Sequence, residues 1–261
     1  MSALVVGLSV VSTSANDPAL KGFLDPNDPV AISFWIISIA MVAATVFFLM
    51  ESMNVGHHWK TSMNVGALVT LVAAVHYFYM REFWVQIGHS PIVYRYIDWS
   101  ITVPLQMIEF YLILVAVQPN IGAGMFWRLL LGTVVMLAAG YAGEAKFVNA
   151  WAGFIVGMLG WVFILFEIFM GEAGNVSASD AVNKYVKSSF NTMRIIVTAG
   201  WSIYPLGYFF GYLLECGSDA NLNLVYNLAD FVNKIGFCLA IWSSAKASTL
   251  EQVNKEGALL A

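Results

Sequence analysis

Residues 221–247 read NLNLVYNLADFVNKIGFCLAIWSSAKA, and this stretch decides the fold. It is a largely apolar run, and a helix of this length can cross a bilayer core, which takes about 20 residues. Lys234 would lie near the middle of the bilayer, where a lysine costs roughly 2.5–3.5 kcal/mol on insertion scales. Asp230 lies four residues earlier, one turn away on the same helical face.

The buried lysine has two interpretations. The first is a structural salt bridge with Asp230 that holds helices together. Buried pairs are poor net stabilisers, however, so an intramembrane lysine with an acidic partner favours a functional site. The second interpretation is therefore an amine that forms a Schiff base with a carbonyl cofactor, because a buried lysine has the reactivity for this chemistry.

The composition predicts an integral membrane protein. Of the 261 residues, 59% are hydrophobic and only 11% are charged, against about 25% charged in an average soluble domain. The net charge of −4 gives no nucleic-acid footprint, so we expect no nucleic-acid partner. The four histidines and two cysteines show no metal-ligand spacing, which predicts no metal site.

Seven apolar segments with short connections predict an all-α bundle of seven transmembrane helices spanning residues 29–248. The first 15 residues resemble a signal peptide, residues 16–28 read as an extracellular lead-in, and residues 249–261 as a cytoplasmic tail. We expect the helices at about residues 29–50, 61–80, 91–117, 125–143, 147–170, 185–214 and 221–247.

The basic residues predict the orientation. With the N-terminus outside, most of them fall on cytoplasmic flanks, as the positive-inside rule requires. The C-terminus is then cytoplasmic. The cytoplasmic flanks hold Lys60, Arg128, Lys184, Lys187, Arg194, Lys246 and Lys255, and the outer flanks hold Lys21, Arg81 and Lys146.

The third segment is more polar than a spanning helix needs to be. Its polar residues follow spacings of three and four, so they share one helical face. They are Arg95, Asp98, Thr102, Gln106 and Glu109. Asp98 and Glu109 are about three turns apart, or roughly 16 Å along the membrane normal. Two acids at different depths facing a buried lysine are what a proton relay needs; the alternative is that they only join helices.

The charges of this region can balance. A protonated Schiff base on Lys234 and the guanidinium of Arg95 give two positive charges, and Asp98 and Asp230 give two negative ones. Such a neutral group is tolerable in a low dielectric where one charge alone is not.

Three motifs resemble those of a known protein family: RYIDWSITVPLQMIEFYLIL at 95–114, WSIYPLGY at 201–208 and NLADFVNK at 227–234. They resemble those of microbial rhodopsins, and of proteorhodopsins in particular, over all seven helices. The resemblance implies all-trans retinal bound covalently to Lys234 as a protonated Schiff base. It also implies that Asp98 is the primary counterion and proton acceptor, and that Glu109 is the cytoplasmic proton donor.

The resemblance also implies the activity. The triplet Asp98, Thr102 and Glu109 matches the outward proton pumps of the family, whereas sodium pumps carry Asn, Asp and Gln and chloride pumps lack the acceptor acid. We therefore expect a light-driven outward proton pump, not an enzyme, that crosses a bacterial inner membrane several times. Its surroundings would be the lipid bilayer and copies of itself in a pentamer or hexamer.

Supporting residues follow from the same resemblance. His76 matches a histidine that pairs with the acceptor aspartate. Gln106 stands where green-absorbing members carry leucine and blue-absorbing members carry glutamine, so a blue-absorbing type is expected. The expected retinal pocket consists of Trp99, Thr102, Gln106, Trp201, Tyr204 and Pro205, although aromatic residues in membrane helices also serve in packing and as interfacial anchors. Glu144 and Glu215 lie near the outer ends of the fourth and sixth helices, where they could join a proton exit route, but we interpret them as solvated helix ends.

Two other functions remain open at this point. One is a sensory photoreceptor with the same chromophore, a slow photocycle and a transducer partner; Glu109 argues against it, because a sensor has no need of fast reprotonation. The other is a receptor or carrier without a covalent cofactor, in which Lys234 and Asp230 bind a diffusible ligand.

Overall fold

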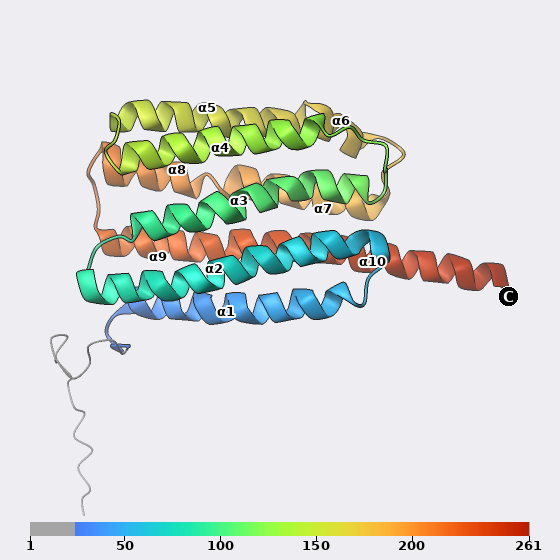
Figure 1. The fold of residues 1–261 in the computed structure, drawn as a ribbon, viewed down its shortest axis with the longest axis horizontal. Coiled ribbons are helices and arrows are strands. Elements are labelled where there is room, and N and C mark those ends of the chain that lie inside the picture. The colour runs from blue at the N-terminus through green and yellow to red at the C-terminus, as the bar shows by residue number, and fades with distance from the viewer. Residues whose placement is uncertain (1–23, 261) are drawn as a thin grey trace, which may run out of the picture.

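The computed structural model describes residues 24–260, and every regular element in this range is helical (Figure 1). The signal-peptide prediction for residues 1–15 lies outside the described residues. The first five transmembrane helices are α1 (Pro29–Ser52), α2 (Lys60–Ile87), α3 (Ile92–Val115), α4 (Gly124–Glu144) and α5 (Ala150–Phe169).

The sixth and seventh transmembrane helices are each built from several pieces. The sixth comprises α7 (Lys184–Ile195), the π-helical η3 (Ile196–Gly200), α8 (Ile203–Tyr208) and the π-helical η4 (Phe209–Leu213). The seventh comprises α9 (Asp219–Asp230), the π-helical η5 (Phe231–Ile235) and α10 (Gly236–Leu260). The predicted all-α bundle of seven helices is therefore confirmed.

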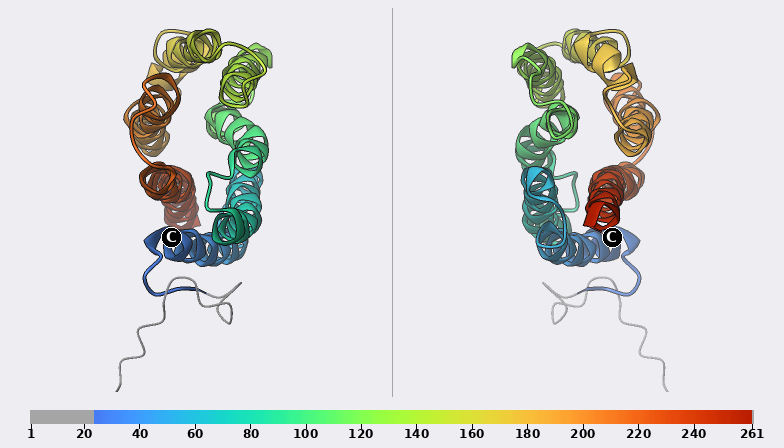
Figure 2. Two further views of the ribbon diagram at one scale, coloured as in Figure 1. Left: turned by 90° about the vertical axis from the view of Figure 1, so that its left-hand side faces the viewer. Right: turned by 90° about the vertical axis from the view of Figure 1, so that its right-hand side faces the viewer.

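The helices form a closed ring. Viewed end-on in Figure 2, they follow one another around the ring in chain order, and the seventh helix returns beside α1. The polar face of α3 points into this ring, because Arg95, Asp98, Thr102, Gln106 and Glu109 are all buried. The ring therefore places the polar column opposite the lysine of the seventh helix.

The outer surface of the ring is apolar. Large side chains such as Ile36, Leu131, Leu159 and Leu228 are exposed on it, which suits contact with lipid. Six helical stretches in the described range are long and apolar enough to cross a membrane. The sixth transmembrane helix is broken by a turn at Trp201 and Ser202, between η3 and α8, so neither of its parts is long enough to be such a stretch.

Local signals fix several helix ends. The Oδ1 atom of Asp28 accepts hydrogen bonds from the backbone N–H groups of Val30 and Ala31, both at 3.0 Å, and so caps α1. Asn149 caps α5 in the same way. Gly88 ends α2 with a φ of 73°, a left-handed conformation that glycine adopts without steric cost.

Three features differ from the expectations. The last helix continues to Leu260, beyond the expected start of the tail at residue 249. A short helix, α6 (Glu172–Ala178), follows α5, and Arg128 Nη2 donates to Glu172 Oε2 at 2.5 Å in its first turn. Glu144 is not a solvated helix end: it is only 7% exposed and accepts a hydrogen bond from Tyr96 at 2.8 Å.

Helices α4 and α5 approach each other closely through glycine. A Cβ atom added at Gly160 would lie 2.7 Å from the backbone nitrogen of Met136 and 2.9 Å from the carbonyl oxygen of Gly132. Both neighbours are backbone atoms, so a side chain at this position can be accommodated only if the two helices separate.

We expect Gly160→Ala to lower the stability of the folded protein by about 1–3 kcal/mol, the usual cost of overpacking. Gly122→Ala is the matched control, because a Cβ atom at Gly122 meets nothing within 4 Å. The measurement is thermal unfolding of the two variants and the unaltered protein in one detergent. Equal melting temperatures for the two variants would contradict the close packing of α4 on α5.

Candidate functional site

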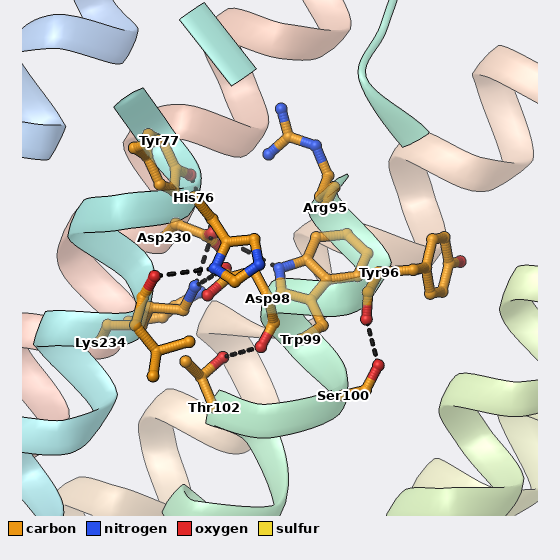
Figure 3. A network of polar contacts seen from close by, with 12 residues as sticks. His76, Tyr77, Arg95, Tyr96, Asp98, Trp99, Ser100, Thr102, Asp230 and Lys234 are labelled. Carbon is orange, nitrogen blue, oxygen red and sulfur yellow. Dashed lines mark hydrogen bonds and ion pairs between the residues drawn. The ribbon is translucent and has the colours of Figure 1, made fainter. Parts of the chain in front are cut away.

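Lys234 lies in η5 and is only 2% exposed. Its Nζ atom donates hydrogen bonds to Asp98 Oδ2 on α3 and to Asp230 Oδ2, the latter at 3.0 Å (Figure 3). Both carboxylates are fully buried. The structure therefore brings together the three charged groups that the sequence placed on two facing helices.

The two carboxylates differ in how many donors they already have. Both oxygens of Asp230 accept hydrogen bonds: Oδ1 from Tyr204 at 2.5 Å, and Oδ2 from Tyr77 at 2.8 Å and from Lys234. Asp98 Oδ1 has no hydrogen-bond partner among the described residues. Of the two acids, Asp98 is therefore the one with an oxygen free to take up a proton.

Arg95 is buried near these carboxylates but is not bonded to them. Its Nη2 atom donates to the side-chain oxygens of Asn223, at 2.8 Å, and Asn227, at 3.2 Å. Its guanidinium lies 5.2 Å from the ring centre of Tyr226. The direct partners of Arg95 are thus amide oxygens of α9 rather than carboxylates, and the expected charge balance stays a prediction.

His76 lies in the same cluster as Asp98 (Figure 3), close enough for an electrostatic interaction between the two side chains. Its Nδ1 atom lies 2.9 Å from the carbonyl oxygen of Val72, one turn back in α2. In the described part of the chain, no direct hydrogen bond joins His76 to Asp98. The pairing of these two residues stays a prediction.

A cavity adjoins the lysine. Trp99, Gln106, Trp201, Tyr204 and Pro205, which the sequence predicted for a cofactor pocket, all line it. Lys234 and Asp230 also line this cavity, and Gly140, Gly153 and Gly157 contribute no side-chain bulk to its wall. Thr102, also predicted for the pocket, is buried and donates its hydroxyl to the carbonyl oxygen of Asp98 at 2.9 Å.

Side chains satisfy backbone carbonyls in the π-helical turns around the cavity. Asn233 Nδ2 donates to the carbonyl oxygen of Gly200 at 3.0 Å, and Trp161 Nε1 donates to that of Val197 at 3.0 Å. Gln106 Nε2 donates to the carbonyl oxygen of Asn233 at 3.1 Å. Such turns leave backbone groups without their usual helical partners and occur often at functional sites. Here these bonds fix the backbone at Asn233, the residue before Lys234, and that of the sixth helix at Val197 and Gly200.

Glu109 lies farther along α3, eleven residues beyond Asp98. It is 1% exposed, and neither of its oxygens has a hydrogen-bond partner in the range 24–260. The buried hydroxyl of Ser62 on α2 is the polar group beside it. A carboxyl group in such apolar surroundings is easier to keep in its neutral, proton-carrying form than as an unpaired charge.

Residues 28–248 match the family model described as bacteriorhodopsin-like protein. The chain belongs to this family. It is 51% identical over 225 residues to the green-light absorbing proteorhodopsin of Gamma-proteobacterium EBAC31A08, covering 86% of this chain and 89% of that protein. It is 48% identical over 246 residues to the blue-light absorbing proteorhodopsin of Gamma-proteobacterium Hot 75m4, covering 93% and 95%.

A solved structure supports the same assignment. The crystal structure of blue light-absorbing proteorhodopsin from Med12 superposes on this bacteriorhodopsin-like protein with a TM-score of 0.73 and 46% identity, over 84% of this chain and 98% of that one. The resemblance to proteorhodopsins expected from three motifs is therefore confirmed. This protein is a multi-pass membrane protein of the microbial rhodopsin family.

Sequence reasoning missed several residues of the site in this microbial rhodopsin. Two of them are Asn223 and Asn227. Together with Asp230 and Lys234, which were predicted, they are spaced by four, three and four residues and so share one face of the seventh helix. That spacing could have identified the two amides as partners for Arg95. Tyr77, which donates to Asp230, carried no comparable signal, because its partner lies 153 residues away in the sequence.

Proposed function

We propose that this protein is a light-driven outward proton pump, with all-trans retinal bound to Lys234 Nζ through a Schiff base. The observation that carries the proposal is the asymmetry around Lys234. Its Nζ atom contacts two buried carboxylates, and within residues 24–260 only Asp98 of the two has an oxygen without a hydrogen-bond donor. Retinal supplies light absorption and an isomerisation that changes the position and basicity of the nitrogen to which it is joined.

The residues of the cavity fit such a group. An elongated apolar chromophore needs flat, rigid walls, and Trp99, Trp201 and Tyr204 provide aromatic ones. Lys234 opens into the same cavity and supplies the amine. The relatives named as proteorhodopsins support the assignment, because their names record light absorption.

Asp98 is the proposed proton acceptor. It lies in hydrogen-bond contact with Lys234 Nζ, so a proton can pass between the two without another side chain. Asp230 receives hydrogen bonds on both oxygens and serves in the proposal as the fixed negative charge that holds the lysine in place. Arg95 supplies the balancing positive charge from the side of Asn223 and Asn227.

Glu109 is the proposed proton donor. It lies on α3 toward the end of the bundle at which α10 projects (Figure 1), which the distribution of basic residues assigns to the cytoplasm. With the acceptor on one side of Lys234 and the donor on the other, protons would move from the cytoplasm to the outside. The protein would then act in the bacterial inner membrane as a transporter and not as an enzyme, in pentamers or hexamers as the family resemblance implies.

The test is illumination of retinal-supplied cells while the external pH is recorded. We expect light to acidify the medium, and a protonophore to abolish the change. A visible absorption band without any acidification would favour the sensory photoreceptor. No visible band after retinal is supplied would favour a receptor or carrier of a diffusible ligand.

Gln106→Leu is expected to shift the absorption peak to longer wavelength while pumping is retained. The amide of Gln106 lines the cavity and donates to the carbonyl oxygen of Asn233, the residue before Lys234. Its removal takes a dipole away from the chromophore and frees that carbonyl oxygen.

The measurement is an absorption spectrum of retinal-loaded protein. Gln118→Leu is the control, since Gln118 follows α3 and does not line the cavity. A peak that stays in place in Gln106→Leu would mean that this amide has no influence on the absorption of the chromophore.

A further inference from the structure

A chain of polar contacts leads from Arg95 to one end of the bundle. Asn223 Oδ1 accepts a hydrogen bond from Arg95 Nη2 at 2.8 Å and one from Ser90 Oγ at 3.4 Å. The backbone N–H of Ser90 donates to Asp219 Oδ2 at 3.1 Å, and His89 Nδ1 lies 3.1 Å from the same oxygen. Each contact shares a residue with the next, so the chain is continuous from the guanidinium to the imidazole.

Exposure rises along this chain. Arg95 and Asn223 are buried, whereas the side chain of Asp219 is 44% exposed and that of His89 is 77% exposed. An ion pair as exposed as this one contributes little to stability. Stability alone therefore does not explain the His89–Asp219 pair. Its position at the exposed end of a buried network suggests a functional role instead.

The same contacts join two segments that lie far apart in the sequence. His89 and Ser90 belong to the connection between α2 and α3, which begins at the left-handed Gly88, and Asp219 lies in the first turn of α9. At the inner end, the Nε and Nη1 atoms of Arg95 have no hydrogen-bond partner among the described residues, although Arg95 is only 2% exposed. The network thus retains buried donors at one end and titratable groups in water at the other.

We propose that Asp219 and His89 form the pair from which the transported proton leaves the protein. The proposal rests on the outward pumping proposed above and adds its exit. In each cycle the pair takes up one proton that arrives past Arg95 and gives one proton to bulk water, so both groups return to their starting charges. Arg95 stays protonated throughout, because a guanidinium does not lose its proton in proteins, and it orients the network instead.

The residue types suit this role. Histidine is the side chain that most readily exchanges a proton near neutral pH. An oxygen of the Asp219 carboxylate lies 3.1 Å from the ring nitrogen, so the two groups can pass a proton directly between them. Ser90 binds Asp219 through its backbone N–H and Asn223 through its hydroxyl, so it ties the exposed pair to the buried amide.

A second carboxyl group competes as an exit. Glu144 lies at the end of α4 and accepts a hydrogen bond from Tyr96, the neighbour of Arg95 on α3. It is buried, however, whereas Asp219 and His89 are in contact with water. A test of the release pair therefore has to include a variant of Glu144.

The test compares two times after a laser flash on retinal-loaded protein in lipid vesicles. Visible absorption gives the time at which the Lys234 nitrogen loses its proton, and a pH-sensitive dye gives the time at which a proton appears in the medium. We expect Asp219→Asn and His89→Asn to delay the appearance of the proton in the medium by roughly tenfold or more. The usual contribution of a positioned acid or base, about 10²–10⁴-fold, is the upper limit of this effect. The time at which the Lys234 nitrogen loses its proton should be the same as in the unaltered protein.

Glu82→Gln is the matched control, because Glu82 is another carboxylate near the same end of the bundle, with Arg81 and Gln86 as its partners. Asparagine at position 219 keeps an oxygen for the Ser90 N–H, so a purely structural role predicts normal release in Asp219→Asn. Release as fast as in Glu82→Gln would overturn the proposal, and a delay confined to Glu144→Gln would move the exit to α4. Absence of light-driven release from the unaltered protein would instead refute the proposed pump itself.

Discussion

Lys234→Ala is expected to remove the visible absorption band completely, with the bundle still folded. Lys234 is the lysine that lines the cavity, and its Nζ atom lies between Asp98 and Asp230. Without this amine no covalent bond to retinal can form at that position. The measurement is an absorption spectrum of the purified variant after incubation with all-trans retinal.

The control for this variant is Lys246→Ala. Lys246 lies three turns farther along α10, where it pairs with Glu51 at 3.1 Å on the side of the molecule expected to be cytoplasmic. Its loss should leave the band unchanged. A normal visible band in Lys234→Ala would refute the central assignment of the site. Circular dichroism should show equal helical content in both variants, which separates loss of the chromophore from loss of the fold.

Most of the fold could be predicted from the sequence, because a membrane span is a property of local composition and length. The facing of the third and seventh helices was also predictable: a polar column on one helix and a lysine in the other have to meet inside the bundle. The i, i+4 pair of Asp230 and Lys234 follows from helical geometry alone, and its atoms lie 3.0 Å apart.

The missing parts depend on contacts between distant segments. No local signal marks η3, η4 or η5 as π-helical, and η3 and η5 are joined by a bond between distant segments, from Asn233 to the carbonyl oxygen of Gly200. The burial of Glu144 likewise requires Tyr96 from α3 to reach the end of α4. A sequence pattern gives the face on which a residue lies, but not which side chain of another helix meets it.

The hydrogen bonds of the site distinguish the two acidic neighbours of Lys234, to which the proposed function gives different tasks. Asp230 is bonded to Tyr77 and Tyr204, so its place is fixed from α2 and α8 as well as from its own helix. Asp98 has Lys234 as its side-chain partner and keeps one oxygen unbonded in the described structure. The residue types alone do not distinguish the two aspartates, and their hydrogen-bond partners support the proposed division into a fixed charge and a proton acceptor.

Glu109→Gln is expected to leave the chromophore intact but to slow the return of a proton to Lys234 by roughly 10²–10⁴-fold, the usual contribution of a positioned general acid. Glu109 is buried, both its oxygens are unbonded in the described structure, and it lies eleven residues from Asp98 on the same helix. Glutamine has nearly the same shape and polarity, so the packing around Ser62 is kept while the proton that can be donated is lost.

The measurement is flash photolysis at several pH values, with the lifetime of the deprotonated Lys234 nitrogen as the readout. In Glu109→Gln the proton has to come from solution, so this lifetime should lengthen as the pH rises. Glu172→Gln serves as the control. Glu172 lies in the short helix α6, does not line the cavity, and pairs with Arg128 of α4. If Glu109→Gln and Glu172→Gln decay equally fast at every pH, Glu109 is not the donor, and the case for a pump over a sensory photoreceptor loses its main support.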